Sequence, residues 1–216
     1  MPASSNIADI RTDYRLAELN EDVAGSDPVL FFRKWFEEGE TSQITEINAM
    51  TLATVDGNGA PHARIVLLKG LDENAFVFFS NYDSNKGHEL LANPRAALVF
   101  FWKELERQVR VEGVIEKVSD SDSDLYFHSR PEGSRLGAWA SPQSKEIPHR
   151  NILDLNYEKY KQEFSAVAIP RPPHWGGYRV VPNRIEFWQG RSSRMHDRIL
   201  FSWNGDGSWR RSRLAP

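Results

Sequence analysis

The sequence contains no cysteine, which excludes disulfide bonds, thiolate zinc sites and cysteine nucleophiles together. Long apolar runs are absent as well. The longest one, from Ala96 to Trp102, is far shorter than the ~20 residues that a membrane-spanning helix needs. The segment from Met1 to Asn20 has no apolar core of the kind found in a signal peptide. These absences predict a cytoplasmic protein without a membrane segment.

A large net charge is also missing. The 27 Lys and Arg nearly balance the 30 Asp and Glu, and the net charge of −3 gives no general attraction to nucleic acids or membranes. The balance is uneven, however, because residues 171–216 hold nine Arg, no Lys and three acids, a local charge of +6. Arginine favours planar, bidentate contacts with phosphate or carboxylate. We therefore expect an anion site near the C-terminus.

Several motifs of common enzyme and binding classes are absent. The chain has no Gly-x-Gly-x-x-Gly, no P-loop and no Gly-x-Ser-x-Gly. Its six histidines are scattered without the spacing of a zinc site. The signatures of RNA-binding modules are missing too. The sequence therefore gives no support to serine nucleophile chemistry, a metal site or a nucleic-acid partner.

What the sequence does contain is enough apolar material for a core and a regular series of strand patterns. Hydrophobic residues make up 40% and aromatic residues 12% of the chain. Asp56–Gly59 and Asn204–Gly207 are typical hairpin turns. Strands are expected at residues 49–55, 61–69, 75–80, 95–103, 107–118, 177–181, 184–189, 196–203 and 208–214. Successive strands with short turns favour a mainly β, closed antiparallel barrel with peripheral helices.

Helices are expected between and before these strands. Asp27 is a good N-cap, Pro28 suits a first helical position and Gly39 suits a helix end. Further helices are expected at residues 84–91, 119–128, 134–140 and 151–164. Residues 1–26 are polar and are predicted to form a mobile N-terminal arm with a short helix around residues 7–19. Residues 27–216 are predicted to form a single domain.

Two segments of the expected barrel place cations where phosphate could bind. In the strand from Arg64 to Lys69, an apolar middle has a cation at each end, which would suit an anionic, ring-bearing ligand. In the segment from Ser80 to Lys86, a polar loop runs into a helix, whose free N–H groups favour phosphate. Each segment also has a plain structural interpretation, as a strand with solvated ends and as a capped surface helix.

A third segment carries Tyr126, Arg130 and Ser134 at four-residue steps. On one continuous helix these side chains would share a face and form a phosphate clamp. Because Pro131 interrupts such a helix, they could instead meet across a turn. The structural alternative is a helix end with a surface arginine.

The fourth segment, residues 185–198, is the most distinctive. On a strand, Arg194, His196 and Arg198 would share one face, which is costly unless an anion or an electron-rich ligand lies against them. Trp188 nearby favours an aromatic ligand. The structural alternative is a strand edge open to solvent.

This fourth segment resembles the signature of the pyridoxine/pyridoxamine 5′-phosphate oxidase family. The shared pattern is an aliphatic residue, Glu, an aromatic residue, Trp-Gln, four further residues, and Arg-aliphatic-His-Asp-Arg. The segments at residues 64–69, 106–109, 126–131, 143–145 and 213–216 are similar to the family in the same order. The resemblance covers essentially the whole chain.

The resemblance implies an FMN-binding split β-barrel that works as a homodimer with the flavin at the subunit interface. Asn85 stands where many members of the family carry an arginine beside the flavin-phosphate lysine, which implies weaker retention of FMN. The residues implied to contact FMN are Arg64, Ile65, Val66, Leu67, Phe79, Ser80, Lys86, Gln108, Gln143, Ser144, Trp188 and Arg198. Those implied to bind the substrate are Lys69, Tyr126, Arg130 and Ser134 at its phosphate, the catalytic pair Arg194 and His196 at its ring, and Arg11 and Tyr14 as a cover.

The activity implied by the resemblance is oxidation of pyridoxine 5′-phosphate and pyridoxamine 5′-phosphate to pyridoxal 5′-phosphate, in vitamin B6 biosynthesis and salvage. A hydride passes from the substrate C4′ to the flavin, dioxygen is reduced to hydrogen peroxide, and the amine also releases ammonia. Two alternatives stay open. One is a flavin oxidase of another ring, such as the phenazine-biosynthesis type, and the other is a non-catalytic flavin- or pyridoxal-phosphate-binding barrel. Lys69 and the Tyr126, Arg130 and Ser134 set favour a phosphorylated substrate.

Overall fold

A computed structural model describes residues 6–72 and 74–216 of the chain, and its strands join in one nine-stranded sheet. The strand order is β2-β1-β5-β6-β7-β4-β3, with β8 beside β7 and β9 beside β8. Peripheral helices complete the predicted antiparallel β architecture, which is confirmed. The strands are β1 (Ala49–Val55), β2 (Pro61–Leu67), β3 (Gly70–Asp72), β4 (Ala75–Asn81), β5 (Arg95–Trp102), β6 (Arg107–Lys117), β7 (Trp175–Gln189), β8 (Asp197–Trp203) and β9 (Trp209–Leu214).

The N-cap predicted at Asp27 is confirmed. In α2 (Pro28–Thr41), the Asp27 carboxylate accepts hydrogen bonds from the N–H groups of Val29 and Leu30. The prediction that Gly39 ends this helix is wrong. Gly39 lies inside it, where a Cβ would come within 2.2 Å of Ile47, so the glycine permits close packing. The other helices are α1 (Glu21–Ala24), α3 (Asn85–Ala92), α4 (Asp120–Ser129), α5 (Glu132–Ala140) and α6 (Asn151–Glu163), with 3₁₀ turns η1 (Ile7–Asp9), η2 (Lys103–Leu105) and η3 (Ser192–Arg194).

The N-terminal segment differs from its predicted short helix. Between η1 and α1 the backbone is irregular, and two of its N–H groups bond to side chains distant in the sequence. Leu16 N donates to Glu106 Oε2 at 3.0 Å, and Leu19 N donates to Asp197 Oδ2 at 3.1 Å. These tertiary bonds replace the local ones of a helix. The first five residues of the predicted arm lie outside the described residues, and the division into arm and single domain stays a prediction.

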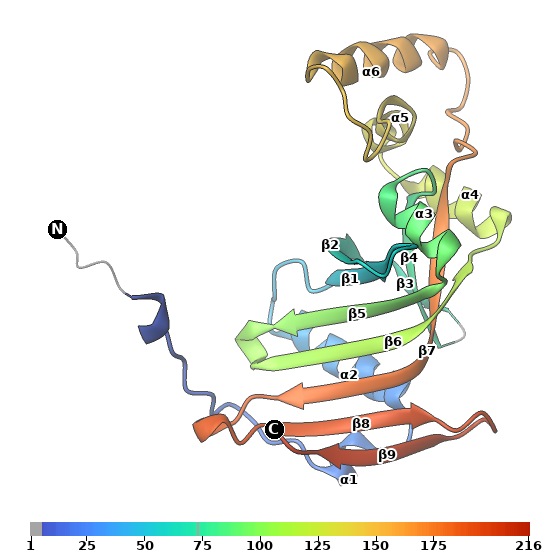
Figure 1. Cartoon of the computed structure of the whole chain (residues 1–216). Helices are drawn as coiled ribbons and strands as arrows, with labels where there is room; N and C mark the ends of the chain where they lie inside the picture. The colour runs from blue at the N-terminus through green and yellow to red at the C-terminus, as the bar shows by residue number, and fades with distance from the viewer. Residues whose placement is uncertain (1–5, 73) are drawn as a thin grey trace. The chain divides into compact units, whose positions relative to one another are not determined.

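The contacts of the chain divide it into two compact units. Unit 1 comprises residues 1–47, 99–111 and 184–216, and β8 and β9 form its C-terminal hairpin (Figure 1). Its core is aromatic: the ring of Phe187 lies 4.6 Å from that of Phe31 and 5.2 Å from that of Trp35. Phe32 and Phe100, 5.0 Å apart, are fully buried beside them. Burial of these large rings contributes stabilising apolar area to this unit.

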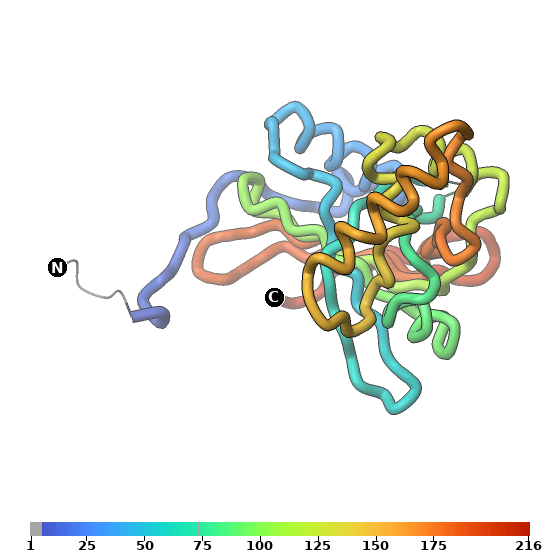
Figure 2. The backbone as a smooth tube through the Cα atoms, turned by 90° about the horizontal axis from the view of Figure 1, so that it is seen from above, coloured from blue at the N-terminus to red at the C-terminus, as the bar shows by residue number. Residues whose placement is uncertain are grey.

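Unit 2 comprises residues 48–98 and 112–183. Strands β1 and β2 pair as a hairpin, and β4 pairs with the first half of β7. Helices α5 and α6 pack against each other in both views (Figure 1, Figure 2). A buried cluster of Phe127, Leu136, Ile169 and Trp175 fixes the helical layer. In the described part of the chain, no helix is long and apolar enough to cross a membrane.

Acidic partners offset much of the positive charge near the C-terminus. In unit 1, Arg213 pairs with Glu21 and Asp197, each at 2.8 Å. Arg198 pairs with the buried carboxylate of Glu186 at 2.8 Å. Part of the local excess of arginine therefore takes part in ion pairs within unit 1.

Candidate active site

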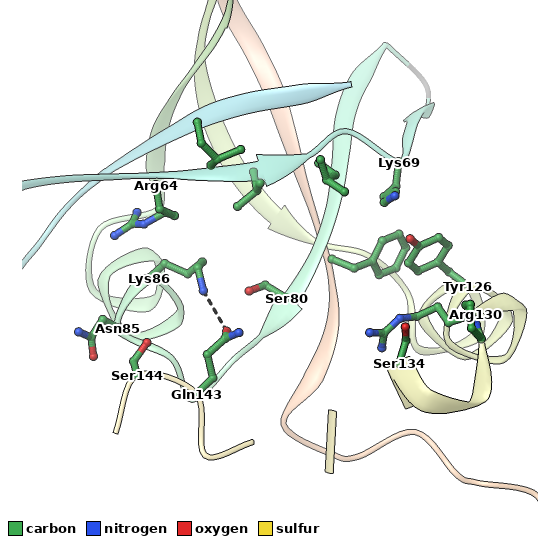
Figure 3. Close-up of a pocket in the computed structure, with 15 residues that line it drawn as sticks. Arg64, Lys69, Ser80, Asn85, Lys86, Tyr126, Arg130, Ser134, Gln143 and Ser144 are labelled. Carbon is green, nitrogen blue, oxygen red and sulfur yellow. Dashed lines mark hydrogen bonds between the residues drawn. The ribbon is translucent and has the colours of Figure 1, made fainter. Parts of the chain in front are cut away.

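A cavity of about 780 Å³ lies within unit 2. Its lining includes cations at two separate ends and apolar side chains between them (Figure 3). The residues that line it are Arg64, Ile65, Val66, Leu67, Lys69, Phe79, Ser80, Asn85, Lys86, Tyr126, Arg130, Pro131, Ser134, Gln143 and Ser144. Thirteen of these fifteen are residues that the sequence predicted for flavin or substrate binding.

Local backbone geometry brings the elements of the cavity together. Arg64 lies in β2 opposite Leu52 of β1, and Ser80 lies near the end of β4. The chain then turns tightly into α3, whose N-cap is Ser84. A Cβ on Gly87 would come within 1.9 Å of the carbonyl oxygen of Tyr82, so only glycine permits this turn. The turn places Lys86 in the first turn of α3, as predicted.

We call Arg64, Asn85, Lys86, Gln143 and Ser144 the Arg64 end of the cavity (Figure 3). Lys86 Nζ donates to Gln143 Oε1 and to Ser84 Oγ, each at 3.0 Å. Burial, together with the nearby charge of Arg64, lowers the pKa of Lys86 to about 8. The ammonium is therefore poorly solvated, and an anion beside it would restore favourable interactions.

A buried network holds the guanidinium of Arg64. Its Nη2 lies 3.0 Å from Glu89 Oε2, its Nη1 donates to Thr54 Oγ1, and its Nη1 also lies 3.5 Å from Leu52 O. Glu89 Oε1 lies 2.5 Å from His62 Nδ1. Burial acts to raise the pKa of Glu89, but hydrogen bonds from Thr54, His62 and Arg64 hold this pKa below its usual value. Arg64 is thus ion-paired to a carboxylate outside the cavity lining.

We call Lys69, Tyr126, Arg130 and Ser134 the Arg130 end (Figure 3). Helix α4 ends before Pro131 and α5 begins after it, so the set does not lie on one continuous helix. The two helices meet at a tight turn, in which Ser134 N donates to Pro131 O at 2.9 Å. The sequence left two arrangements open, a continuous helix and a turn. In the structure, Tyr126, Arg130 and Ser134 meet across a turn.

Arg130 has aromatic neighbours in place of a carboxylate. Its guanidinium lies 4.6 Å from the ring centre of Trp175 and 5.7 Å from that of Phe127. Its Nη1 is buried and has no hydrogen-bond partner within residues 6–72 and 74–216. Burial lowers the pKa of this guanidinium, although an arginine stays charged. A buried, unpaired donor is costly, so this end is suited to receive an anion.

A stack of aromatic rings supports this end. The ring of Tyr126 lies 3.9 Å from that of Phe79 at an interplanar angle of 19°. Phe79 and Trp175 are stacked at 5.5 Å. Because Phe79 and Tyr126 both line the cavity, the stack continues the wall from the apolar middle to the Arg130 end.

In unit 1, three predicted residues form a second aromatic group. The ring of His196 lies 4.7 Å from Trp188 and 6.1 Å from Tyr14, and Tyr14 meets Trp188 edge-on at 5.8 Å. A Cβ on Gly190 would come within 2.6 Å of the Tyr14 ring, so this glycine leaves room for the N-terminal segment. His196 Nδ1 accepts a hydrogen bond from Arg191 N at 3.1 Å.

The predicted common strand face of Arg194, His196 and Arg198 is wrong. Arg194 lies in η3 with φ of +60°, and β8 begins only at Asp197. Arg194 is exposed, whereas Arg198 is held by Glu186 at 2.8 Å and so does not stand as an unpaired cation. Two further predicted residues also lie in unit 1. Arg11 is exposed between η1 and α1, and Gln108 is half-buried in β6.

Sequence reasoning missed two residues that support the cavity. Glu89 lies three residues after Lys86 on α3, so helical spacing could have placed it beside the phosphate-binding face. Trp175 begins β7 after a proline-rich loop, and no local pattern connects it with Arg130. Its role follows only from tertiary packing.

The cavity can hold a ligand with negative charge at each end. Both ends carry cations and hydroxyl or amide groups, which recognise phosphate. Ile65 is exposed by 65% and Leu67 by 37%, and with Phe79 they offer apolar contact to a ring system between the ends. This arrangement suits two phosphorylated ring compounds or one long one.

The chain matches two family models that together cover most of its length. Residues 37–164 match the model described as pyridoxamine 5′-phosphate oxidase, and residues 175–216 match the pyridoxine 5′-phosphate oxidase C-terminal dimerisation region. A pyridoxine/pyridoxamine 5′-phosphate oxidase of Ralstonia pickettii is 59% identical over 212 residues, which is 98% of this chain and 100% of that one. The oxidase of the same description from Microcystis aeruginosa is 54% identical over 98% of this chain and 99% of its own.

Two solved structures are similar in fold. The crystal structure of PhzG from Burkholderia lata, in complex with tetrahydrophenazine-1-carboxylic acid, has a TM-score of 0.86 at 27% identity, covering 93% of this chain and 99% of that one. A pyridoxamine 5′-phosphate oxidase-related, FMN-binding protein of Nostoc punctiforme has a TM-score of 0.71 at 17% identity, covering 89% of this chain and 100% of its own. The second likeness supports the fold alone.

Proposed function

The chain belongs to the pyridoxine/pyridoxamine 5′-phosphate oxidase family, and we propose that FMN is its flavin and dioxygen its electron acceptor. As a member of this family, it is an oxidoreductase that forms pyridoxal 5′-phosphate from pyridoxine 5′-phosphate and from pyridoxamine 5′-phosphate. The observation that carries the proposal is the cavity with two differently built cationic ends. One end suits the phosphate of a flavin, and the other suits the phosphate of the substrate.

The Arg64 end fits the FMN phosphate. Lys86 and Arg64 supply two cations, and Ser144 and Gln143 supply polar groups beside them. The first turn of α3 adds the favourable dipole of a helix N-terminus. The flavin ring would contact Ile65, Val66, Leu67, Phe79 and Ser80 from the middle of the cavity, and Gln108, Trp188 and Arg198 complete the proposed FMN set.

The Arg130 end fits the substrate phosphate. Its unpaired Arg130 Nη1 would gain a charge-assisted hydrogen bond, with Lys69, Tyr126 and Ser134 as further donors. Phosphate held here would fix the position of the pyridine ring, so binding energy remote from C4′ becomes alignment at C4′.

The bound flavin supplies the hydride acceptor, which no side chain can provide. Arg194 and His196 are proposed to brace the oxygen and ring of the substrate, and Arg11 and Tyr14 to cover it. The packing of Tyr14 and Trp188 around His196 supports a restrained imidazole in this role. We expect Arg194→Ala to reduce kcat/KM far more than FMN affinity, and equal losses of both would contradict the assignment.

The match to the C-terminal dimerisation region indicates a homodimer. We propose that the flavin lies at the subunit interface of this dimer. Such an interface would also cover Ile65, whose side chain is exposed by 65% on β2.

A phenazine-type oxidase is the second candidate, and the high TM-score to the Burkholderia lata protein favours it. The identity to that protein is 27%, however, compared with 59% to the Ralstonia pickettii oxidase. The phosphate-binding character of the Arg130 end also favours a phosphorylated substrate over a phenazine carboxylic acid.

The direct test is an anaerobic half-reaction. Purified protein loaded with FMN is mixed with pyridoxine 5′-phosphate without oxygen, and the visible absorbance of the oxidised flavin is followed. The proposal predicts bleaching, recovery of the absorbance on admitting air, and formation of pyridoxal 5′-phosphate with hydrogen peroxide. FMN-loaded protein that neither the alcohol nor the amine can bleach would exclude this function and leave the fold unaffected.

A further inference from the structure

Glu89 is a buried carboxylate directly behind the Arg64 end. It is exposed by only 6% and lies three residues after Lys86 on the same helix. Both of its oxygens are engaged, because Oε2 meets Arg64 Nη2 at 3.0 Å and Oε1 meets His62 Nδ1 at 2.5 Å. It does not belong to the cavity lining, so it can influence a ligand only through the residues that it holds.

We propose that Glu89 is a positioning residue of the flavin-phosphate site, which fixes the direction of the Arg64 guanidinium before phosphate arrives. This inference rests on the proposed binding of FMN. It assigns no contact between Glu89 and the ligand.

Several hydrogen bonds restrain the guanidinium of Arg64. Thr54 Oγ1 donates to Glu89 Oε2 at 2.5 Å and accepts from Arg64 Nη1, so one hydroxyl links the carboxylate to the guanidinium. Arg64 Nη1 also lies 3.5 Å from the carbonyl oxygen of Leu52 on the paired strand. With Nη1 and Nη2 both tied to this network, the guanidinium plane is fixed and the remaining donors are directed by it. Preorganised donors lose less entropy when they bind an anion.

The charge of Glu89 has a second consequence at the same end. Arg64 and Lys86 are both cations, and their repulsion acts to lower the pKa of Lys86. Glu89 opposes this effect on the same lysine. The buried carboxylate of Glu89 therefore reduces the repulsion between Arg64 and Lys86. Both side chains can then stay charged in a partly desolvated site before a phosphate binds.

The contribution of the phosphate can be isolated by comparing FMN with riboflavin, which is the same ring system without phosphate. Apoprotein of the full chain would be titrated with each flavin, and quenching of flavin fluorescence gives the two dissociation constants. We expect Glu89→Ala to weaken FMN binding about tenfold, equivalent to one charge-assisted hydrogen bond, while riboflavin binding changes less than about twofold. A parallel loss of both flavins would mean that Glu89 only supports the fold, and the inference would be wrong.

Two further variants separate positioning from general support. Glu89→Gln keeps an oxygen that can accept from Arg64, so we expect it to restore FMN binding to within about threefold of wild type. Leu90→Ala removes a neighbouring buried side chain of α3, exposed by 3%, and it should leave the ratio of FMN to riboflavin affinity unchanged. A ratio that falls as far in Leu90→Ala as in Glu89→Ala would contradict a specific role for Glu89.

A double-mutant cycle tests whether Glu89 acts through Arg64. In an Arg64→Ala background, Glu89→Ala should cost less than about a further twofold in FMN affinity. Fully additive losses would overturn the inference. If Glu89→Ala does not fold, Glu89→Asp, which withdraws the carboxylate by one methylene, takes its place in the same cycle.

The same titrations distinguish this inference from the function on which it depends. Wild-type protein that binds FMN no more tightly than riboflavin would exclude the flavin-phosphate assignment and the inference with it. A wild-type preference for FMN that Glu89→Ala leaves intact would exclude the inference alone.

Discussion

The two ends of the cavity hold their arginines by opposite means. Arg64 is ion-paired to Glu89 and hydrogen-bonded through Thr54, so its charge is partly neutralised before any ligand binds. Arg130 lies against the ring of Trp175 and keeps a buried Nη1 without a partner in the described residues. An aromatic ring orients a guanidinium without competing for its hydrogen bonds, whereas a carboxylate does compete.

This difference corresponds to what each end is proposed to bind. A cofactor that stays bound benefits from a binding site whose side chains are already held in place without it. A substrate that arrives and leaves in each cycle gains more from a donor that has no other partner, because no existing hydrogen bond has to be replaced. Variants of the two ends should therefore affect different measurements, with FMN affinity changing at one end and kcat/KM at the other.

The largest separation is expected from Arg130→Ala. Removing the unpaired guanidinium should reduce kcat/KM for pyridoxine 5′-phosphate by about 100-fold or more, chiefly through KM, because a desolvated charged contact is lost. FMN affinity should stay within about twofold. Steady-state kinetics and flavin titration measure the two quantities. Arg135→Ala is a matched control, because Arg135 lies five residues further along and lines another cavity. An equal loss in the control, or an equal loss of FMN affinity, would remove the distinction between the ends.

The reciprocal variant is Lys86→Met. Loss of the ammonium should weaken FMN binding by about tenfold to 100-fold, while KM at saturating FMN stays within about twofold. The dissociation constant of FMN and the KM of the loaded enzyme are the measurements. Lys161→Met on α6, which lines the same other cavity as Arg135, is the control for a lost lysine. A raised KM with unchanged FMN affinity would place the flavin phosphate elsewhere.

A change of pH is expected to have a smaller effect, and only on the binding of FMN at the Arg64 end. The pKa of Lys86 is lowered to about 8 by burial and by Arg64, so the lysine is charged below that pH and loses its proton above it. Because phosphate binds the charged form, the dissociation constant of FMN should rise about tenfold for each pH unit above 8 until the higher pKa of the complex is reached. Below pH 7 this lysine contributes no pH dependence. Titrations of FMN across this range in wild type and Lys86→Arg provide the measurement, and a dependence that persists in Lys86→Arg would exclude Lys86 as its source.

The smallest effect is expected from Asn85→Arg, which adds a cation at the Arg64 end. One further exposed charge-assisted contact should tighten FMN binding about threefold to tenfold and leave kcat/KM of the loaded enzyme unchanged. Flavin fluorescence titration gives the constant. An FMN dissociation constant equal to that of wild type would count against the view that this position limits FMN retention.

The sequence predicted most of the strands, because alternation and turn residues are local signals. It predicted two strands, at residues 177–181 and 184–189, yet Trp175–Gln189 is one strand that pairs with β4 and then with β8. It also expected a helix where the backbone of Leu16 and Leu19 bonds to distant carboxylates. Tertiary hydrogen bonds of that kind leave no trace in local periodicity.

For the site, the family resemblance implied thirteen of the fifteen residues that line the cavity but not the contacts that hold them in place. The four-residue spacing of Tyr126, Arg130 and Ser134 was informative, although the turn at Pro131 could not be distinguished from a continuous helix. Neither the pairing of Arg64 with Glu89 nor the stacking of Arg130 on Trp175 follows from spacing, because each joins segments at least 25 residues apart. These contacts, and hence the difference between the two ends, could be identified only from the structure.

The central claim is that the Arg130 end recognises the phosphate of the substrate while the Arg64 end keeps the flavin. The most direct test measures flavin bleaching without oxygen by pyridoxine 5′-phosphate and by pyridoxine, in wild type and Arg130→Ala, both loaded with FMN. We predict that wild type reduces its flavin at least about 100-fold more efficiently with the phosphorylated compound, and that Arg130→Ala loses most of this preference while still holding FMN. An undiminished preference in Arg130→Ala would contradict the account.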